Sequence, residues 1–392
     1  MRDLEEGCKK AYVRLDSNSC MANHKCPTMR DYRLDLLKAL AMLLVLFWHL
    51  QPVKVLASSD RSAGSFSIVS GIVQAFNYQI TLIAVPSFLI VSLYLFLKRS
   101  ETSNSIYHMI GRIRRPLKLF IFWAVVQCSF WFATKNLFPN HIMQYDQSFV
   151  WRISWFDMLV FGGPALPFVG DSVFYYLSAL ILLMLIVLCY LALSDRARKI
   201  VGWTIVVASL VYFELAALAG YSLPYWRIDC FVVYIPITYF AVKSTEYFLK
   251  ARHWYLLGYI LFSLQDLIFI YLERTMHVHL GFGQYGRISV VLGATTMASM
   301  ALSLSPSFRT NLKSIHFLGS NTLGIFAIHK YFQMLFTMGC LERFNALRII
   351  DSFWIGNVNL SIVNLACALL TVVVTIFAVG ILRNTFLKPL LV

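Results

Sequence analysis

Apolar stretches about 20 residues long recur along almost the whole chain, and they limit its fold more than any other feature. Such a stretch has the length that an α-helix needs to cross the hydrocarbon core of a bilayer. Only 14% of the residues are charged, against about a quarter in soluble domains. We therefore predict an all-α polytopic membrane protein with about ten transmembrane helices. The predicted spans cover residues 36–55, 69–97, 114–134, 172–193, 199–220, 228–243, 254–273, 286–304, 316–337 and 362–382.

The formal net charge of +15 is explained by membrane topology. Lys and Arg gather in the N-terminal segment and in every second loop between the predicted spans, as the positive-inside rule describes for cytoplasmic segments. We therefore expect both termini to be cytoplasmic. No basic patch interleaved with aromatic residues lies outside the apolar stretches, so nucleic acid is not an expected partner. We expect no cleavable signal peptide, because the first apolar run is too long for one.

The eight cysteines form no CxxC pair. Most of them lie in the polar N-terminal segment or within predicted spans, so we expect no disulfide framework. His24 lies near Cys20 and Cys26, which is a weak metal-binding pattern that we interpret as part of a solvated tail. The sequence thus predicts no metal site.

The first predicted span carries ionisable side chains on one face. Lys38 and His49 are about 20° apart around a helix axis and roughly 16 Å apart along it, and Asp35 falls within about 40° of the same stripe. An ionisable group inside a membrane helix is costly and usually faces a cavity or a functional site. The alternative is that His49 only forms a packing contact with a neighbouring helix.

A basic cluster leads into the third span. Arg112, Arg114, Arg115 and Lys118 lie close together in sequence, and the spacing of Arg112 and Arg115 places both on one helix face. Two guanidinium groups arranged in this way suit bidentate contacts with phosphate. The phosphate belongs either to a substrate or to lipid headgroups that anchor the helix.

Two further features leave alternatives open. Glu214, Asp266 and Lys330 lie within apolar spans, and we expect Lys330 to pair with one of the two carboxylates because an unpaired buried charge is costly. The aromatic-rich loop at about 135–171 is either a carbohydrate-facing surface or an interfacial belt.

Four segments resemble the acyltransferase 3 family of integral-membrane O-acyltransferases. Residues 38–49 are similar to its first-helix signature, a basic residue and a histidine separated by ten others, and residues 112–115 are similar to its Arg-x-x-Arg motif. Residues 85–92 resemble its second-helix pattern, although Leu93 replaces the usual glycine. Residues 317–329 resemble its late leucine-glycine to isoleucine-histidine helix. The similarity extends from about residue 30 to 385.

The resemblance implies transfer of an acyl group, commonly acetyl, from cytoplasmic acyl-CoA to a hydroxyl of an extracytoplasmic envelope saccharide. The acceptor would be an O-antigen, an exopolysaccharide, an oligosaccharide or a glycolipid. The expected location is the plasma (bacterial inner) membrane, with a cytoplasmic tail at 1–33, a transmembrane domain at 34–385 and a short cytoplasmic tail at 386–392. Acyl-CoA would be the donor substrate, without a metal.

The resemblance also implies roles for individual residues. His49 would act as general base or as acyl carrier, and Asp35 would orient Lys38. The CoA phosphates would bind Arg112, Arg114, Arg115 and Lys118. The expected contacts to the acceptor or supports of the catalytic groups are Tyr175, Asp171 and His329, and Asp171 is the nearest counterpart of a glutamate frequent in the family.

Two other functions remain open at this point. An ion-coupled secondary transporter of a small solute or glycan precursor would also use buried Glu214, Asp266 and Lys330 with broken helices. An inactive relative could serve as a membrane scaffold. The cation-rich mouth and the stripe from Lys38 to His49 favour the acyltransferase.

Overall fold

This computed structural model describes residues 31–50, 54–55, 76–101, 106–137, 175–276, 280–281, 283–305, 313–346, 352–355, 358–385 and 387–391. The chain divides into two units, Met1–Tyr32 and Arg33–Val392. Asp171, most of the aromatic-rich loop and most of the N-terminal tail lie outside the described residues. The predicted division at 34–385 stays a prediction.

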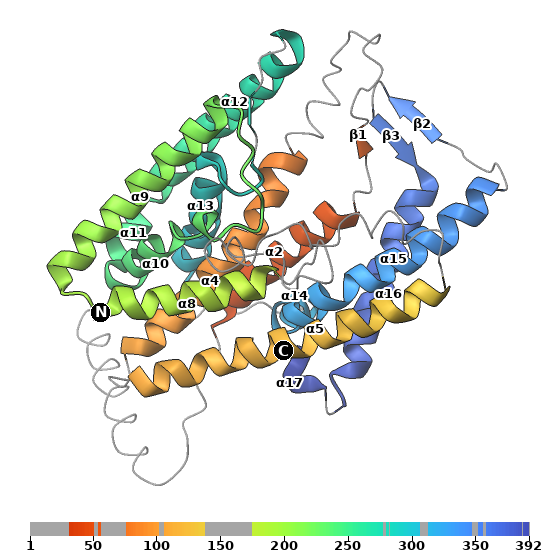
Figure 1. The fold of residues 1–392 in the computed structure, drawn as a ribbon, viewed down its shortest axis with the longest axis horizontal. Coiled ribbons are helices and arrows are strands. Elements are labelled where there is room, and N and C mark those ends of the chain that lie inside the picture. Colours follow the sequence, from red (N-terminus) through yellow and green to blue (C-terminus); the bar gives the residue numbers. More distant parts are fainter. Residues whose placement is uncertain are drawn as a thin grey trace, which may run out of the picture. The chain divides into compact units, whose positions relative to one another are not determined.

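Helices make up most of this second unit (Figure 1). The helices are α2 (Tyr32–Leu50), η1 (Phe76–Ile80), η2 (Thr81–Ile83), α4 (Ala84–Glu101), α5 (Ile106–Leu137), α8 (Tyr175–Ala192), α9 (Asp195–Leu218), η4 (Ile228–Cys230), α10 (Tyr234–Lys243), α11 (Thr245–Lys250), α12 (Arg252–Met276), α13 (Ile288–Ser303), α14 (Lys313–Ser320), α15 (Thr322–Ala346), α16 (Ile362–Leu382) and α17 (Lys388–Leu391). The strands are β1 (Lys54–Val55), β2 (Ser352–Ile355) and β3 (Val358–Ser361), which pair antiparallel in the order β1-β3-β2. The sequence did not predict this small sheet.

The prediction of a helical membrane protein is confirmed. Within the described residues, 5 helices are long and apolar enough to cross a membrane: Phe76–Ser100, Tyr175–Ala192, Asp195–Leu218, Arg252–Leu272 and Leu365–Leu382. The count of ten and the cytoplasmic termini stay predictions. The predicted span at 228–243 is divided between the short η4 and the 10-residue α10, and α10 is about 15 Å long, about half the thickness of the hydrocarbon core.

α4 is the buried centre of the helical unit. It lies against α8, α10 and α13, and Leu89 and Leu93 on it are fully buried. The helix is entered through the π-helical turn η1 and the 3₁₀ turn η2, so Pro86 falls in the first turn of α4. Proline is tolerated there because the irregular backbone before it does not need the N–H···O hydrogen bond that proline cannot donate.

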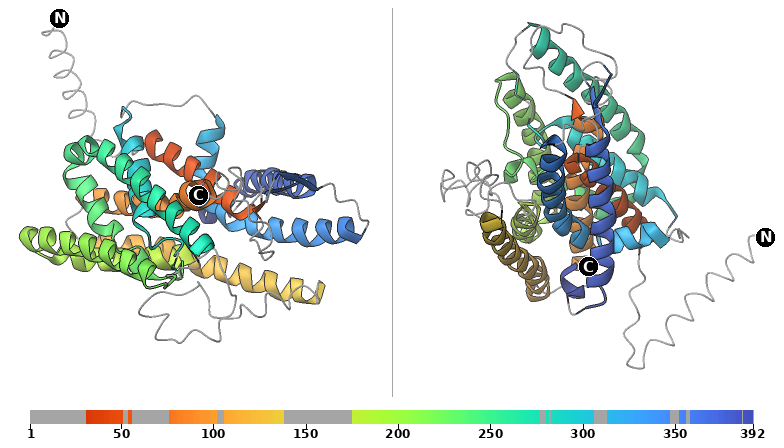
Figure 2. Two further views of the ribbon diagram at one scale, coloured as in Figure 1. Left: turned by 90° about the horizontal axis from the view of Figure 1, so that it is seen from above. Right: turned by 90° about the vertical axis from the view of Figure 1, so that its right-hand side faces the viewer.

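α9 and α12 present apolar side chains to the outside. Trp203 on α9 is 69% exposed and Trp254 on α12 is 73% exposed, and several leucines, isoleucines and valines on the same two helices are also exposed. In water such a surface would be unfavourable, whereas in a bilayer it faces acyl chains. Inside this layer α12 packs along α13, and α15 packs along α16 elsewhere in the unit (Figures 1 and 2).

α2 is held at both ends by other parts of the chain. Near its start, Arg33 donates from Nη1 to the carbonyl oxygens of Leu302 and Leu304 at 3.2 and 3.3 Å. Near its end, the ring of Phe47 meets that of Phe76 edge-on, with ring centroids 4.7 Å apart. Trp48 likewise meets Tyr78 at 5.7 Å. The position of the predicted functional helix is therefore fixed by η1 and by the end of α13.

Candidate functional site

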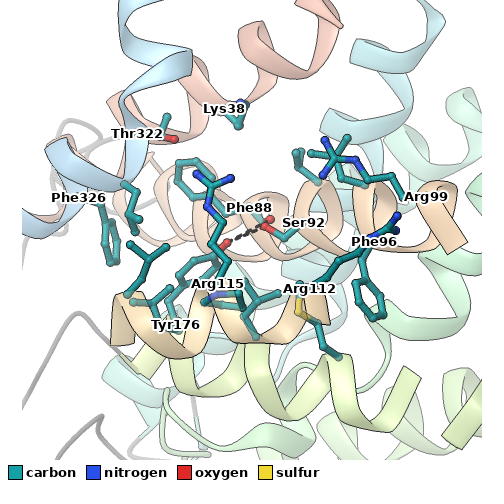
Figure 3. A pocket seen from close by; sticks show the side chains of 18 residues that line it. Lys38, Phe88, Ser92, Phe96, Arg99, Arg112, Arg115, Tyr176, Thr322 and Phe326 are labelled. Atoms are coloured by element: carbon teal, nitrogen blue, oxygen red, sulfur yellow. Dashed lines mark hydrogen bonds between the residues drawn. The ribbon is translucent and has the colours of Figure 1, made fainter. Parts of the chain in front are cut away.

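A cavity of about 460 Å³ lies between α2, α4, α5, α8 and α15 (Figure 3). This volume falls within the range of about 300–1,000 Å³ that is usual for small-molecule sites. Most of its wall is apolar, contributed by leucines and phenylalanines from α4, α5, α8 and α15. The cavity therefore has the size and lining of a ligand site.

Four cationic side chains line this cavity: Lys38, Arg99, Arg112 and Arg115 (Figure 3). The described lining residues include no carboxylate. Nη1 of Arg112 is buried and has no hydrogen-bond partner within the described residues. Burial and the neighbouring Arg99 lower the pKa of Arg112, which lies just before the predicted third span. Bound negative charge would satisfy this donor and offset the repulsion between the two arginines.

The cations come from three helices. Arg112 and Arg115 are one turn apart on α5, and Arg99 is near the end of α4. Lys38 on α2 forms an ion pair with Asp35, with Nζ 2.8 Å from Oδ1. Because the carboxylate of Asp35 is buried, the ion pair holds the ammonium group at the cavity wall.

The other two members of the basic cluster lie elsewhere. Arg114 and Lys118 are exposed and do not line the cavity. Arg99, which the sequence reasoning missed, takes a place beside Arg112 and Arg115. Its position directly after the second predicted span, next to Lys98, was the signal that could have indicated it.

A hydrogen-bonded pair of hydroxyls interrupts the apolar wall. Ser92 Oγ on α4 and Tyr176 OH on α8 are 2.9 Å apart, and both residues line the cavity (Figure 3). Tyr175, which precedes Tyr176 and was the residue that the sequence indicated, does not line the cavity. It is buried and donates to Tyr285 OH at 2.7 Å. The structure thus brings Tyr176, and not Tyr175, to the cavity.

Two histidines meet beside the cavity. The rings of His49 on α2 and His329 on α15 have centroids 5.1 Å apart. His329 is fully buried, and its Nδ1 lies 3.2 Å from the carbonyl oxygen of Ile325. A carbonyl can only accept, so this hydrogen bond requires the proton on Nδ1 and leaves Nε2 as an acceptor in the neutral ring. Nε2 is buried and has no partner in the described part of the chain.

The histidine pair and the cavity are one ring apart. Phe326 lines the cavity, and its ring centroid lies 6.0 Å from that of Tyr176 and 6.1 Å from that of His329. His49 itself is absent from the lining, whereas Lys38 on the same helix is part of it. The stripe predicted on α2 therefore touches the cavity at its Lys38 end and the histidine pair at its other end.

The carboxylates that the sequence offered to Lys330 have other partners. Asp266 Oδ2 accepts from Arg287 Nη1 at 3.2 Å and from Gln79 Nε2 at 3.0 Å. Glu214 Oε2, on α9, accepts from a glutamine on α12 at 2.8 Å. Both acids thus take part in contacts between helices, as structural polar groups do.

The fold and site define a polytopic helical membrane protein with a cation-lined cavity beside a pair of histidines, of which His329 is fully buried. A family model described as an acyltransferase domain matches residues 31–382, nearly the whole chain. The chain therefore belongs to the acyltransferase 3 family and is a membrane acyltransferase, which confirms the resemblance seen in the sequence. No curated protein and no solved structure gives a significant match.

Proposed function

We propose that this acyltransferase moves an acyl group, commonly acetyl, from acyl-CoA to a hydroxyl of an extracytoplasmic envelope saccharide in a plasma (bacterial inner) membrane. The observation that carries the proposal is the apolar cavity with four cations in its wall and a histidine pair one phenylalanine away. Acyl-CoA matches this arrangement because it joins a phosphate-rich end to a long arm that carries the thioester.

The phosphates of acyl-CoA would bind the arginines. Arg112 and Arg115 offer two planar guanidinium groups on one helix face, and the buried Nη1 of Arg112 supplies a donor that lacks a partner in the described chain. Arg99 adds a third guanidinium to the same anion. Exposed Arg114 and Lys118 would contribute by long-range attraction of the donor.

His49 would act as the general base. It takes the proton of the acceptor hydroxyl while the oxygen attacks the thioester carbonyl, and a tetrahedral intermediate forms. The carbon–sulfur bond then breaks, and the imidazolium returns the proton to the leaving thiolate, so the products are the saccharide ester and free CoA. The alternative is that His49 carries the acyl group covalently.

His329 and Lys38 would support this reaction. Nε2 of His329 is an acceptor next to the ring of His49, and it can hold either an N–H of His49 or the acceptor hydroxyl in place. The Asp35–Lys38 ion pair keeps an ammonium group of α2 at the wall of the cavity that the arginines also line. Asp171 and the loop before α8 stay predicted contacts to the saccharide, and Tyr175 would support them from its bond to Tyr285.

Transfer of label from radiolabelled acetyl-CoA to envelope glycans tests the proposal. Membranes with the wild type should label a glycan, and His49→Ala at equal expression should not. Arg115→Ala should raise the apparent KM for acetyl-CoA. If the wild type labels nothing with an acetyl or a succinyl donor, the proposal fails, and solute flux through the protein becomes the measurement that tests transport.

A further inference from the structure

The pair formed by Ser92 and Tyr176 has no assigned role in the transfer. Apart from the four cations, the described polar side chains of the cavity wall are Ser92, Tyr176 and Thr322. A ligand that consisted only of phosphates and an acyl chain would need no hydroxyls in the cavity wall. Two hydroxyls bonded to each other in an apolar wall therefore indicate a polar group in the middle of the ligand.

The hydrogen-bonding capacity of the pair is complementary to a secondary amide. Each hydroxyl has one proton and two lone pairs, so the bond between Ser92 Oγ and Tyr176 OH uses one proton and leaves the other. Besides Ser92 Oγ, Tyr176 OH meets the carbonyl oxygen of Phe88 at 3.5 Å, which is at the outer limit of a hydrogen bond. The pair can thus donate one proton to an amide carbonyl and accept an amide N–H on a lone pair.

The pair lies between the two ends of the site. In the cavity wall it faces the same space as Arg112 and Arg115 (Figure 3). On its other side, the ring of Tyr176 contacts Phe326, whose ring in turn contacts His329. A donor held by its phosphates at the arginines, with its thioester near the histidines, would pass Ser92 and Tyr176 with its arm. In acyl-CoA that arm is pantetheine, which contains two secondary amides.

We propose that Ser92 and Tyr176 form an amide-binding subsite for the pantetheine arm, an inference that rests on the proposed use of acyl-CoA. The subsite makes the enzyme selective for donors with an amide between phosphate and thioester. It also sets the depth to which the arm enters, because an arm bound there can be neither withdrawn nor advanced without loss of the hydrogen bonds. Ser92 and Tyr176 are thus specificity-determining residues that contact the donor.

Three donors separate the contributions: acetyl-CoA, S-acetylpantetheine, which lacks the nucleotide and its phosphates, and an S-acetyl alkanethiol, which has no amide. Ser92→Ala and Tyr176→Phe should each raise the apparent KM for acetyl-CoA and for S-acetylpantetheine by about tenfold, which is the effect of one lost hydrogen bond. The KM for the alkanethiol ester should stay unchanged. Arg115→Gln should raise the KM for acetyl-CoA alone, because only that donor carries phosphates.

Matched controls come from the same two helices. Ser87 on α4 donates to the carbonyl oxygen of Ile83 at 2.7 Å, and Tyr190 on α8 donates to that of Arg198 at 2.8 Å, and neither residue lines the cavity. Ser87→Ala and Tyr190→Phe should keep the wild-type KM for all three donors. The amount of folded protein is followed by size exclusion in detergent. If Tyr176→Phe does not accumulate, Ser92→Cys is a second variant that removes a hydroxyl of the pair.

The outcomes distinguish failure of the proposed subsite from failure of the proposed function. The subsite is overturned if the Ser92 and Tyr176 variants change the KM for the alkanethiol ester as much as the KM for acetyl-CoA. It is also overturned if they change neither of these two KM values. In both cases wild-type transfer from acetyl-CoA leaves the proposed function standing. Absence of wild-type transfer from any CoA donor would instead overturn the proposed function, and the subsite with it.

Discussion

The imidazole rings of His49 and His329 lie with their centroids 5.1 Å apart and their planes at 40°. They come from α2 and α15, near opposite ends of the chain, and Gln333 on α15 also donates from Nε2 to the carbonyl oxygen of His49. Two contacts therefore join the same pair of helices at the level of the histidines. This connection gives each histidine a distinct expected contribution to the reaction.

His49→Ala should lower kcat by about 10²–10⁴-fold, because that is the usual contribution of a general base. His329→Ala should have a smaller effect on kcat, since His329 acts only through what its Nε2 holds, and His329→Gln should recover part of the loss by supplying an acceptor oxygen. Initial rates at saturating acetyl-CoA, corrected for protein amount, measure both. An equal loss in His49→Ala and His329→Ala would contradict this division of roles.

Arg112→Gln should raise the apparent KM for acetyl-CoA by about tenfold, with little change in kcat, because a charge-assisted bond to phosphate is lost. Arg114→Gln should raise it less, because exposed Arg114 offers only long-range attraction. Salt should reduce the effect of Arg114 more than that of Arg112, since screening acts mainly on exposed charges. KM values at two ionic strengths check this, and a larger effect at Arg114 would contradict it.

The sequence could predict what helix geometry decides. The period of an α-helix places Asp35 one turn before Lys38, and it places Arg112 one turn before Arg115. The first two form an ion pair and the second two line the same cavity. Apolar length likewise predicted most of the long helices.

The sequence could not predict what packing decides. Which of Tyr175 and Tyr176 faces the cavity depends on the rotation of α8 against α4 and α5, because adjacent residues point about 100° apart around a helix. Arg99 reaches the cavity because the end of α4 lies next to α5, which is a tertiary contact. The sheet of β1, β2 and β3 joins segments far apart in the chain, and its strands are too short to leave a clear pattern.

Removal of one member of the buried Asp266–Arg287 pair should destabilise the protein. Both side chains are buried, and Asp266 Oδ2 also accepts from Gln79 and Ser289. Arg287→Met leaves this carboxylate without its counter-charge, and the expected loss of stability is about 3–5 kcal/mol. Thermal unfolding in detergent should show a lowered Tm.

The double variant Asp266→Leu with Arg287→Met is the control for this pair. It removes both charges, so it should be more stable than Arg287→Met alone. Both variants should lose activity, because both lack the bond that Arg287 Nη2 donates to the carbonyl oxygen of Tyr78 at 2.6 Å, and Tyr78 packs against Trp48 next to His49. A double variant no more stable than the single one would show that the charge pair is not the source of the loss.

Gly319→Ala should disturb α2 through its backbone. A Cβ at Gly319 would overlap the carbonyl group of Asp35, so α14 and α2 can approach this closely only with glycine there. The overlap is with backbone, which cannot rotate away, and α2 must move at the residue that pairs with Lys38. We expect a lower Tm together with a raised KM for acetyl-CoA.

Gly380→Ala is the matched control, because no neighbouring part of the structure lies within 4 Å of a Cβ at that position. Gly380 lies in the last turn of α16, so alanine there should leave the stability unchanged or raise it by less than about 1 kcal/mol, the gain expected in a helix interior. Equal behaviour of the two variants would show that contact with Asp35 is not what requires glycine at 319.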